Sequence, residues 1–172
     1  MSNREALRDL QTRLAERLQQ ARGQSSAAGW LAVECGSHGL LFPLAGAGEI
    51  FASPPVHPVP HTQPWFVGVA NLRGGLHGVI DIAVFLGLQA RTAWREGAQL
   101  VALNAALASQ SALLVQRLAG LRRADQMQRL PDDGRPRPVF AGDRWADGQG
   151  RVWQEIDLGA LSRHEQYLAI SR

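Results

Sequence analysis

Lysine is absent from this chain of 172 residues, and all 18 basic side chains are arginines, set against 15 acidic ones. The net charge of +3 is small, and the arginines are scattered along the whole chain. Proteins that bind nucleic acids usually concentrate basic residues on one face within a recognisable motif. A loose group is formed by Arg117, Arg122, Arg123 and Arg129. We interpret this group as a solvated face, so the charge pattern favours no nucleic-acid partner.

Cysteine is nearly absent as well, because Cys35 stands alone and excludes a disulfide framework within the chain. A lone thiol fits a reducing compartment, which predicts a cytoplasmic protein. Charged residues such as Arg4, Glu5 and Arg8 interrupt the N-terminal segment, so we expect no signal peptide. The most apolar stretch, residues 98–115, contains several polar side chains, and we therefore expect no membrane insertion.

A leucine stripe is present near the N-terminus, at Leu7, Leu10, Leu14 and Leu18. Offsets of three and four place these side chains on one side of an amphipathic helix. The sequence therefore predicts an N-terminal helix and linker over residues 1–28 and a main domain over residues 29–172. The helix could pack on its own domain or on a partner, and packing at home is the commoner use of such stripes.

The rest of the chain consists of short apolar runs separated by turn residues, a pattern typical of an all-β barrel or sandwich. The paired runs are residues 30–35 and 40–44, 66–70 and 76–82, 98–104 and 112–117, and 139–145 and 150–156. The third pair is rich in Ala and Leu, which favour helix over strand. Five prolines within residues 54–64 predict an ordered loop or sheet edge. Ser162 and Glu165 have the spacing of a capping box, which predicts a short terminal helix.

Sites for metal chemistry are weakly supported. His57 and His61 are four residues apart, but prolines surround them, so the helix that would place both imidazoles on one metal is not expected. His164 and Glu165 would begin a zinc-protease motif, yet Leu168 stands where the second histidine belongs. We predict no metal site and no cofactor.

Catalytic groups are also hard to assemble. Cys35 and His38 could supply a thiol and a base for a small hydrolase, but closeness in a turn does not provide the geometry, and a buried Cys35 is the simpler reading. The segment Gly46-Ala47-Gly48 does not continue as a nucleotide loop and is interpreted as a turn. Asp81 and Asp157 lie in apolar contexts where a carboxylate can serve catalysis or form hydrogen bonds at a strand end, and the second role is the simpler one.

One segment carries a more specific signal. It begins at Gly68, continues through Asn71-Leu72-Arg73-Gly74 into a strand ending at Asp81, and closes with Leu86-Gly87. This segment resembles the signature of CheW-like domains, and the resemblance extends less strongly from residue 30 to residue 172. It departs from many members of the family where Gln116-Arg117 follows the apolar run, because an acidic residue is usual there.

The resemblance implies an all-β fold with terminal helices, built as two SH3-like five-stranded β-barrel lobes. It implies a non-enzymatic adaptor that couples chemoreceptors to a CheA-type histidine kinase. The leucine-striped N-terminus and the ending Tyr167-Leu168-Ala169 look like the pilus-associated PilI branch, which implies type IV pilus twitching motility.

Within the signature, we expect the partner-binding residues to be Asn71, Leu72, Arg73 and Gly74. The Asn71 amide can hold a turn, and the Arg73 guanidinium can clamp carbonyls of its own loops or reach a partner. Two other functions stay open. The first is a small-barrel module for single-stranded nucleic acid, and the second is the hydrolase that uses Cys35.

Overall fold

The computed structural model describes residues 29–52, 54–90 and 97–172. The expected N-terminal helix and linker, residues 1–28, lie outside the described residues, so that prediction stands as it was made. The strands are β1 Gly29–Cys35, β2 His38–Pro43, β3 Ala47–Ala52, β4 Phe66–Leu72, β5 Gly75–Asp81, β6 Gln99–Leu103, β7 Ser111–Val115, β8 Arg117–Arg123, β9 Gln128–Arg129, β10 Ala141–Ala146 and β11 Val152–Ile156. The α-helices are α2 Ile82–Phe85, α3 Leu158–Ser162 and α4 Glu165–Leu168, and the 3₁₀ turns are η1 Ala105–Leu107 and η2 Ala124–Gln126.

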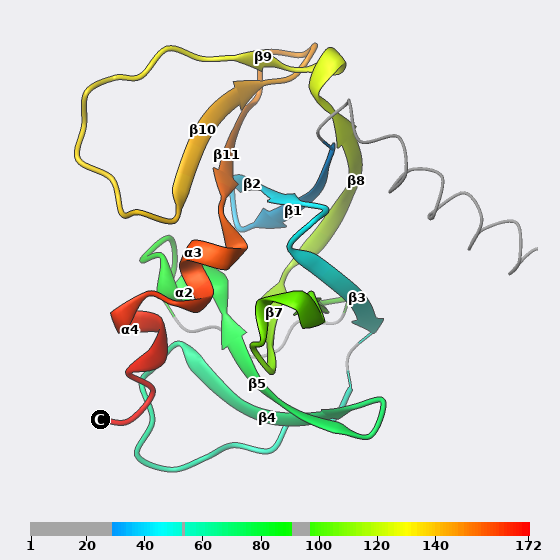
Figure 1. The fold of residues 1–172 in the computed structure, drawn as a ribbon, viewed down its shortest axis with the longest axis vertical. Coiled ribbons are helices and arrows are strands. Elements are labelled where there is room, and N and C mark those ends of the chain that lie inside the picture. Colours follow the sequence, from blue (N-terminus) through cyan, green and yellow to red (C-terminus); the bar gives the residue numbers. More distant parts are fainter. Residues whose placement is uncertain (1–28, 53, 91–96) are drawn as a thin grey trace, which may run out of the picture.

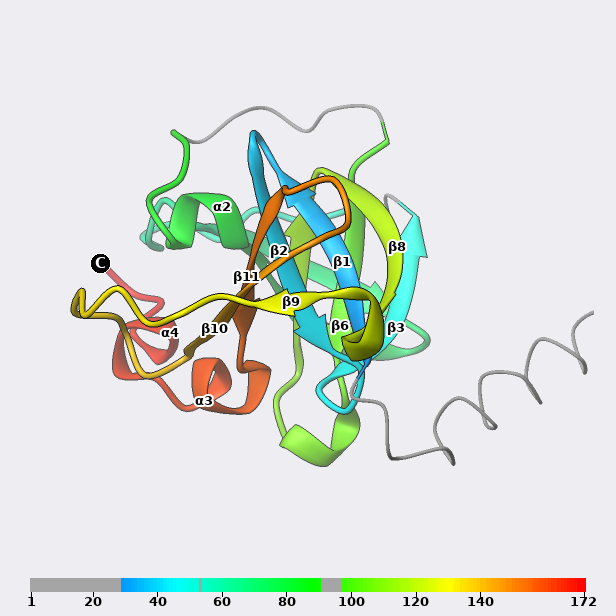
Figure 2. The same ribbon diagram turned by 90° about the horizontal axis from the view of Figure 1, so that it is seen from above.

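Within the described part of the chain, the strands form two sheets that lie one above the other in Figure 1. The first has the order β8-β1-β2-β11-β10-β9, and the second has the order β3-β6-β7-β5-β4. Each contains one parallel pair, β11 with β2 and β5 with β7, among otherwise antiparallel neighbours. The short helices α2, α3 and α4 lie on the same side of both sheets (Figures 1 and 2). The predicted two-lobed, mostly β fold is confirmed, with the two-residue β9 added to the first lobe.

Both sheets are strongly curved. In the first, Trp30 of β1 and Trp145 of β10 meet with ring centroids 4.7 Å apart, although two strands separate them in the sheet order. In the second, Arg73 of the β4–β5 turn forms an ion pair with Glu49 of β3, which lies at the opposite edge. These contacts join strands that are far apart in sheet order, as expected of barrel-like lobes.

The lobes share an apolar core. Val33 and Phe42 from the first sheet pack in the same buried cluster as Ile80, Val101 and Leu113 from the second. All five side chains are at most 1% exposed. A connection through the backbone reinforces this junction, because the Gln116 amide, just before β8, donates to the Glu34 carbonyl of β1. The lobes are therefore parts of one folded unit.

The hairpin predictions are confirmed, including the Ala- and Leu-rich pair that became β6 and β7. In β6, Leu100, Val101, Ala102 and Leu103 are buried, so packing between two neighbouring strands outweighs the helical preference of their residue types. The Pro-rich segment is an irregular loop in which His57 pairs with Val69 of the edge strand β4.

Two local predictions are wrong. The segment 46–48 is not wholly a turn, because Ala47 begins β3 and pairs with Leu103. Ser162 does not cap α4. It ends α3 and donates to the Gly159 carbonyl, while His164 stands at the N-cap.

A close approach between β2 and β11 gives a test of the first lobe. Gly39 of β2 faces Trp153 of β11, which is 1% exposed, and a Cβ at Gly39 would lie 2.5 Å from ring carbon Cε3. Gly39→Ala should lower the free energy of unfolding by about 1–3 kcal/mol, because the packed indole cannot move aside cheaply. Urea denaturation of the two proteins measures the difference.

Gly148→Ala is the matched control, since a Cβ there meets nothing within 4 Å. Its stability should stay within about 0.5 kcal/mol of the parent. Equal stability of the Gly39→Ala and Gly148→Ala variants would contradict the packing described here.

Candidate functional site

The β4–β5 turn carries the expected partner-binding residues. Arg73 and Gly74 have φ values of +50° and +81°, as the two central residues of a type I′ hairpin turn do. The Asn71 side-chain oxygen accepts a hydrogen bond from the Gly74 amide at 2.9 Å. Asn71 therefore holds the turn, as predicted from its amide, and the turn fixes where Arg73 leaves the backbone.

The Arg73 side chain is held by a hydrogen bond and is still exposed to solvent. Its Nε donates to Glu49 Oε1 at 2.7 Å, yet its side chain is 75% exposed. Exposed ion pairs contribute little to stability, so this contact mainly orients the guanidinium. Leu76, three residues after Arg73 on β5, is an exposed apolar side chain at 61%. This hairpin thus carries an oriented cation and an exposed leucine.

Leu72 takes a different place from the other three expected residues. It is 3% exposed and packs in the core of the second lobe with Ala70, Val79 and Leu100. It therefore anchors the start of the turn in this core. Of the four expected residues, Asn71, Arg73 and Gly74 are therefore the accessible ones.

A cavity of about 640 Å³ lies where the two lobes meet. Leu40 and Ile156 of the first sheet line it together with Leu86 and Leu88, which follow α2 of the second lobe. Phe140 contributes a buried ring. Arg137, Arg144 and Arg151 stand among the polar lining residues. This inter-lobe cavity combines an apolar wall with arginine side chains, which suits a ligand that is partly apolar and partly acidic.

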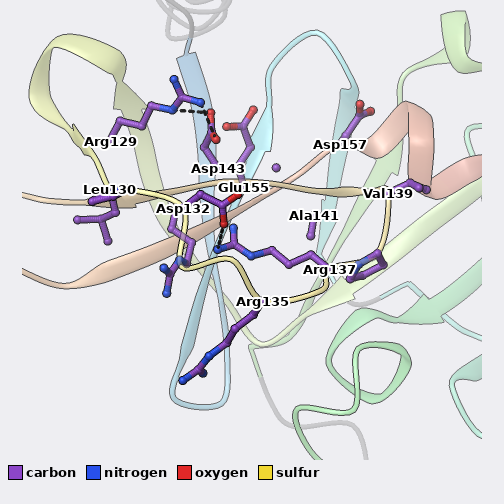
Figure 3. A pocket seen from close by; sticks show the side chains of 14 residues that line it. Arg129, Leu130, Asp132, Arg135, Arg137, Val139, Ala141, Asp143, Glu155 and Asp157 are labelled. Atoms are coloured by element: carbon purple, nitrogen blue, oxygen red, sulfur yellow. Dashed lines mark hydrogen bonds and ion pairs between the residues drawn. The ribbon is translucent and has the colours of Figure 1, made fainter.

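Residues 130–139, which make up most of the chain between β9 and β10, form one wall of this cavity, and we call this segment the strap. In Figure 1 it is the wide yellow arc beside β10. Figure 3 shows a second, polar cavity of about 880 Å³ between the strap and β10. There Arg129 contacts Asp143 and Arg137 contacts Asp132, while Arg135 extends away from both pairs.

An ionic cluster lies at the junction of β1, β8 and β11. Glu34 of β1 is 9% exposed and accepts hydrogen bonds from Arg151 and from Arg117, the latter at 2.7 Å. The hydrogen bond from Arg151 lowers the pKa of Glu34, against the opposing effect of burial, and Arg117 lowers it further. Arg117, part of the departure from the family pattern, thus has a partner within its own lobe.

The groups considered for catalysis are not arranged for it. Cys35 is 2% exposed, and burial raises the pKa of its thiol to about 12. His38 is paired with it across β1 and β2, but His38 is exposed, whereas Cys35 belongs to the buried core. Asp81 and Asp157 accept hydrogen bonds from the amides of Val84 and Ala160, so both cap helices, in agreement with the structural reading of the sequence.

The described residues contain no group of three or more His, Cys, Asp and Glu side chains suited to hold a metal ion. His57 and His61 lie on the Pro-rich loop, and the backbone of each is engaged, with His57 paired to Val69 and His61 accepting from the Arg172 amide. None of the helices in the described ranges is long and apolar enough to span a bilayer.

Two features of this surface escaped sequence reasoning. The first is the edge strand β8, which carries most of the arginines that were interpreted as a solvated group. One of them, Arg117, forms an ion pair with Glu34. The strap is the second feature, because its proximity to Arg144 depends on how β10 is placed. The clustering of Asp132, Asp133, Arg135 and Arg137 was the available signal, but spacing alone does not reveal the cavity beneath.

Residues 29–166 match the family model described as a CheW-like domain. The fold is similar to the crystal structure of the scaffolding protein TtCheW from Thermoanaerobacter tengcongensis, with a TM-score of 0.63 and 14% identity, over 76% of this chain and 88% of that one. No curated protein matches the sequence.

The buried thiol makes a prediction about reactivity. In the native protein at pH 8, Cys35 should react with a thiol reagent such as dithionitrobenzoate no faster than the protein unfolds, because the thiolate is the reactive form and it is disfavoured. In denaturant the same thiol should react at once. Rapid stoichiometric labelling of the native protein would show that Cys35 is accessible and reopen the hydrolase reading.

The Glu34 cluster makes a prediction about pH. Glu34→Gln should lower the free energy of unfolding at pH 7 by about 1–2 kcal/mol, since a largely buried charge-assisted pair is lost. The folded pKa of Glu34 lies below its ordinary value of 4.5, so its contribution is present above that pH and is lost as the pH falls through the folded pKa. The difference between variant and parent should therefore shrink in acid.

Asp125→Asn is the matched control, because Asp125 is 57% exposed in its pair with Arg123. It should change stability by less than about 0.5 kcal/mol at either pH. A Glu34→Gln effect that stays constant from pH 7 to pH 3 would contradict the assignment of the stabilisation to the charge.

Proposed function

The chain belongs to the CheW-like family, and from that premise we propose that it is a cytoplasmic, non-enzymatic signalling adaptor that couples chemoreceptors to a CheA-type histidine kinase. TtCheW, the protein with the similar fold, is a scaffolding protein, and a scaffold needs accessible surfaces in place of a reactive centre. The observation that carries the proposal is the oriented, 75% exposed guanidinium of Arg73 on a rigid turn.

The kinase contact is assigned to the β4–β5 turn. Arginine is enriched at interface hot spots, and its planar donors suit carboxylates and backbone carbonyls. Asn71 fixes the turn and Glu49 orients Arg73, so little side-chain freedom is lost on binding. The exposed Leu76 supplies the apolar surface that such an anchor needs around it. We propose that this surface docks on a β-barrel regulatory domain of the kinase.

The receptor contact is assigned to the inter-lobe cavity. Both lobes line it, and its apolar wall of Leu40, Leu86 and Leu88 is large enough for side chains of a partner segment. The two proposed contacts lie on different parts of the molecule, with no lining residue of the cavity in the β4–β5 turn. One polypeptide can therefore engage two partners at once, which is what coupling requires.

The finer assignment, to type IV pilus twitching motility, is supported by the leucine stripe at Leu7, Leu10, Leu14 and Leu18 and by the chain ending. The alternative functions have weaker support. The buried Cys35 does not favour a hydrolase. Three of the exposed arginines, Arg73, Arg123 and Arg129, pair with carboxylates, which does not favour a nucleic-acid surface.

Arg73→Asn tests the kinase contact. Asparagine tolerates positive φ better than most residues, so the turn at φ +50° should survive the change. The dissociation constant for the kinase regulatory domain, measured by titration calorimetry, should rise about tenfold or more, as for a hot-spot arginine. Thermal denaturation should be nearly unchanged.

Arg123→Asn is the matched control, because Arg123 is 63% exposed and ion-paired but lies on the other lobe. It should leave the affinity for the kinase domain unaltered. Binding by the Arg73→Asn variant as tight as the parent's would remove Arg73 from the interface, and failure of the parent to bind both kinase and receptor fragments would overturn the adaptor function.

A further inference from the structure

The strap is held to the rest of the protein by few contacts. At its ends, the Leu130 amide donates to the Arg144 carbonyl, and the Ala141 amide donates to the Pro138 carbonyl. Between these points lie Pro131, Pro136 and Pro138, which have no amide hydrogen to offer a neighbouring strand. Residues 131–136 are exposed. The middle of the strap therefore depends on side chains for its position.

Asp133 is the side chain that ties the strap to the sheet. Its Oδ2 lies 3.2 Å from a terminal nitrogen of Arg144 on β10, and its Oδ1 accepts from Arg137 within the strap at 2.7 Å. The Arg135 amide also donates to Oδ1, at 3.2 Å. Asp133 thus occupies a position on the guanidinium of Arg144 at the edge of the inter-lobe cavity, which both residues line.

Arg144 is only partly satisfied by this contact. Its Nε is buried and has no hydrogen-bond partner in the part of the chain that the structure describes. A buried donor without an acceptor is unfavourable, and carboxylates commonly engage a guanidinium through two parallel hydrogen bonds. Asp133, reaching in from the strap, uses one end of that donor set and leaves the other unused.

The cavity behind Arg144 has the complementary chemistry. Its wall is formed by apolar side chains such as Leu40, Leu86 and Ile156, and Arg151, which pairs with Glu34, also lines it. A ligand that fits both parts has a carboxylate for Arg144 and an apolar body for the wall. Segments of a partner that carry an acidic side chain beside apolar ones meet this description.

We propose that the strap is a self-blocking element, in which Asp133 takes the place on Arg144 that an acidic side chain of the receptor segment occupies after the strap is displaced. This inference rests on the proposed function for the identity of the partner, but the competition between Asp133 and a carboxylate does not. Displacement is feasible because residues 131–136 are exposed and the ion pair that joins the strap to β10 is part-exposed, so water can reach both charges when the contact opens.

Competition by an internal carboxylate has a measurable signature. A ligand for a site that is open only part of the time binds with an affinity reduced by the open fraction. Asp133→Asn removes the charge that holds the strap closed, so it should tighten binding, whereas loss of an ordinary contact residue weakens it. Arg144→Gln removes the cation for which both carboxylates compete and should weaken binding.

The experiment titrates the full chain and its variants with two probes. The first is the purified cytoplasmic tip fragment of the cognate receptor, and the second is 4-phenylbutyrate, with 4-phenylbutanamide as its uncharged analogue. For Asp133→Asn we expect the dissociation constants of the receptor fragment and of 4-phenylbutyrate to fall threefold or more. For Arg144→Gln we expect them to rise at least fivefold. The amide should bind the charge variants and the parent with less than a twofold spread.

Asp143→Asn is the matched control. Asp143 neighbours Arg144 on β10 but pairs with Arg129 and does not line the inter-lobe cavity. It should leave both dissociation constants unchanged. Circular dichroism and thermal denaturation confirm that each variant is folded.

The outcomes separate the two proposals. If the parent binds the receptor fragment and Asp133→Asn binds it no more tightly, the self-blocking role is overturned and the adaptor function stands. If the receptor fragment does not bind but 4-phenylbutyrate follows the expected order, the strap acts as proposed and the receptor contact is wrong. If 4-phenylbutyrate binds the parent and Asp133→Asn equally, the competition is refuted whatever the receptor fragment does.

Discussion

Burial of β1 and β2 against β5, β6 and β7 is the constraint on which the rest of the structure depends. Val33 and Phe42 from one sheet share a core with Ile80, Val101 and Leu113 from the other, all at most 1% exposed. Interiors packed in this way resist small displacements, so the two lobes are fixed relative to each other. The inter-lobe cavity and the β4–β5 turn therefore keep a constant separation, which suits a protein that holds two partners together.

The curvature of each lobe follows from contacts between strands that are not neighbours. Trp30 and Trp145 meet inside the first lobe, while Arg73 and Glu49 meet on the surface of the second. The first contact packs the buried Trp30 against the partly buried Trp145 and supports the fold. The second is exposed and adds little stability, so its main effect is to orient the Arg73 side chain.

The sequence predicted hairpins well because each is a local event. The apolar runs of β1 and β2, or of β4 and β5, are adjacent in the chain and are joined by short turns, so residue types alone indicate that they pair. β3 and β8 were missed because their pairing is set from a distance. β3 pairs with β6, and β8 pairs with β1, more than 80 residues earlier. Exposed edge strands such as β8 have only a weak apolar pattern, so composition does not mark them.

For the candidate site too, the sequence predicted the local contacts and missed those between distant residues. Asn71 and Gly74 could be assigned to a turn from their residue types, and the structure bears this out in the hydrogen bond between them. The contact of Arg73 with Glu49 could not, because it depends on how the second sheet closes. The strap is the extreme case. Asp133 and Arg144 are eleven positions apart, and their meeting at the cavity depends on the course of the strap between β9 and β10.

Charge balance around the strap explains why such an element can be both ordered and displaceable. Asp133 interacts with Arg137 and Arg144, which lowers its pKa to about 2 and keeps it ionised under physiological conditions. The same side chain is exposed enough for water to replace its partners, and the strap prolines restrict the conformations open to it after release. The strap therefore loses little conformational entropy when it closes. The ion pair of Asp133 with Arg144 can therefore favour the closed strap and still let a carboxylate ligand that binds more strongly reach Arg144.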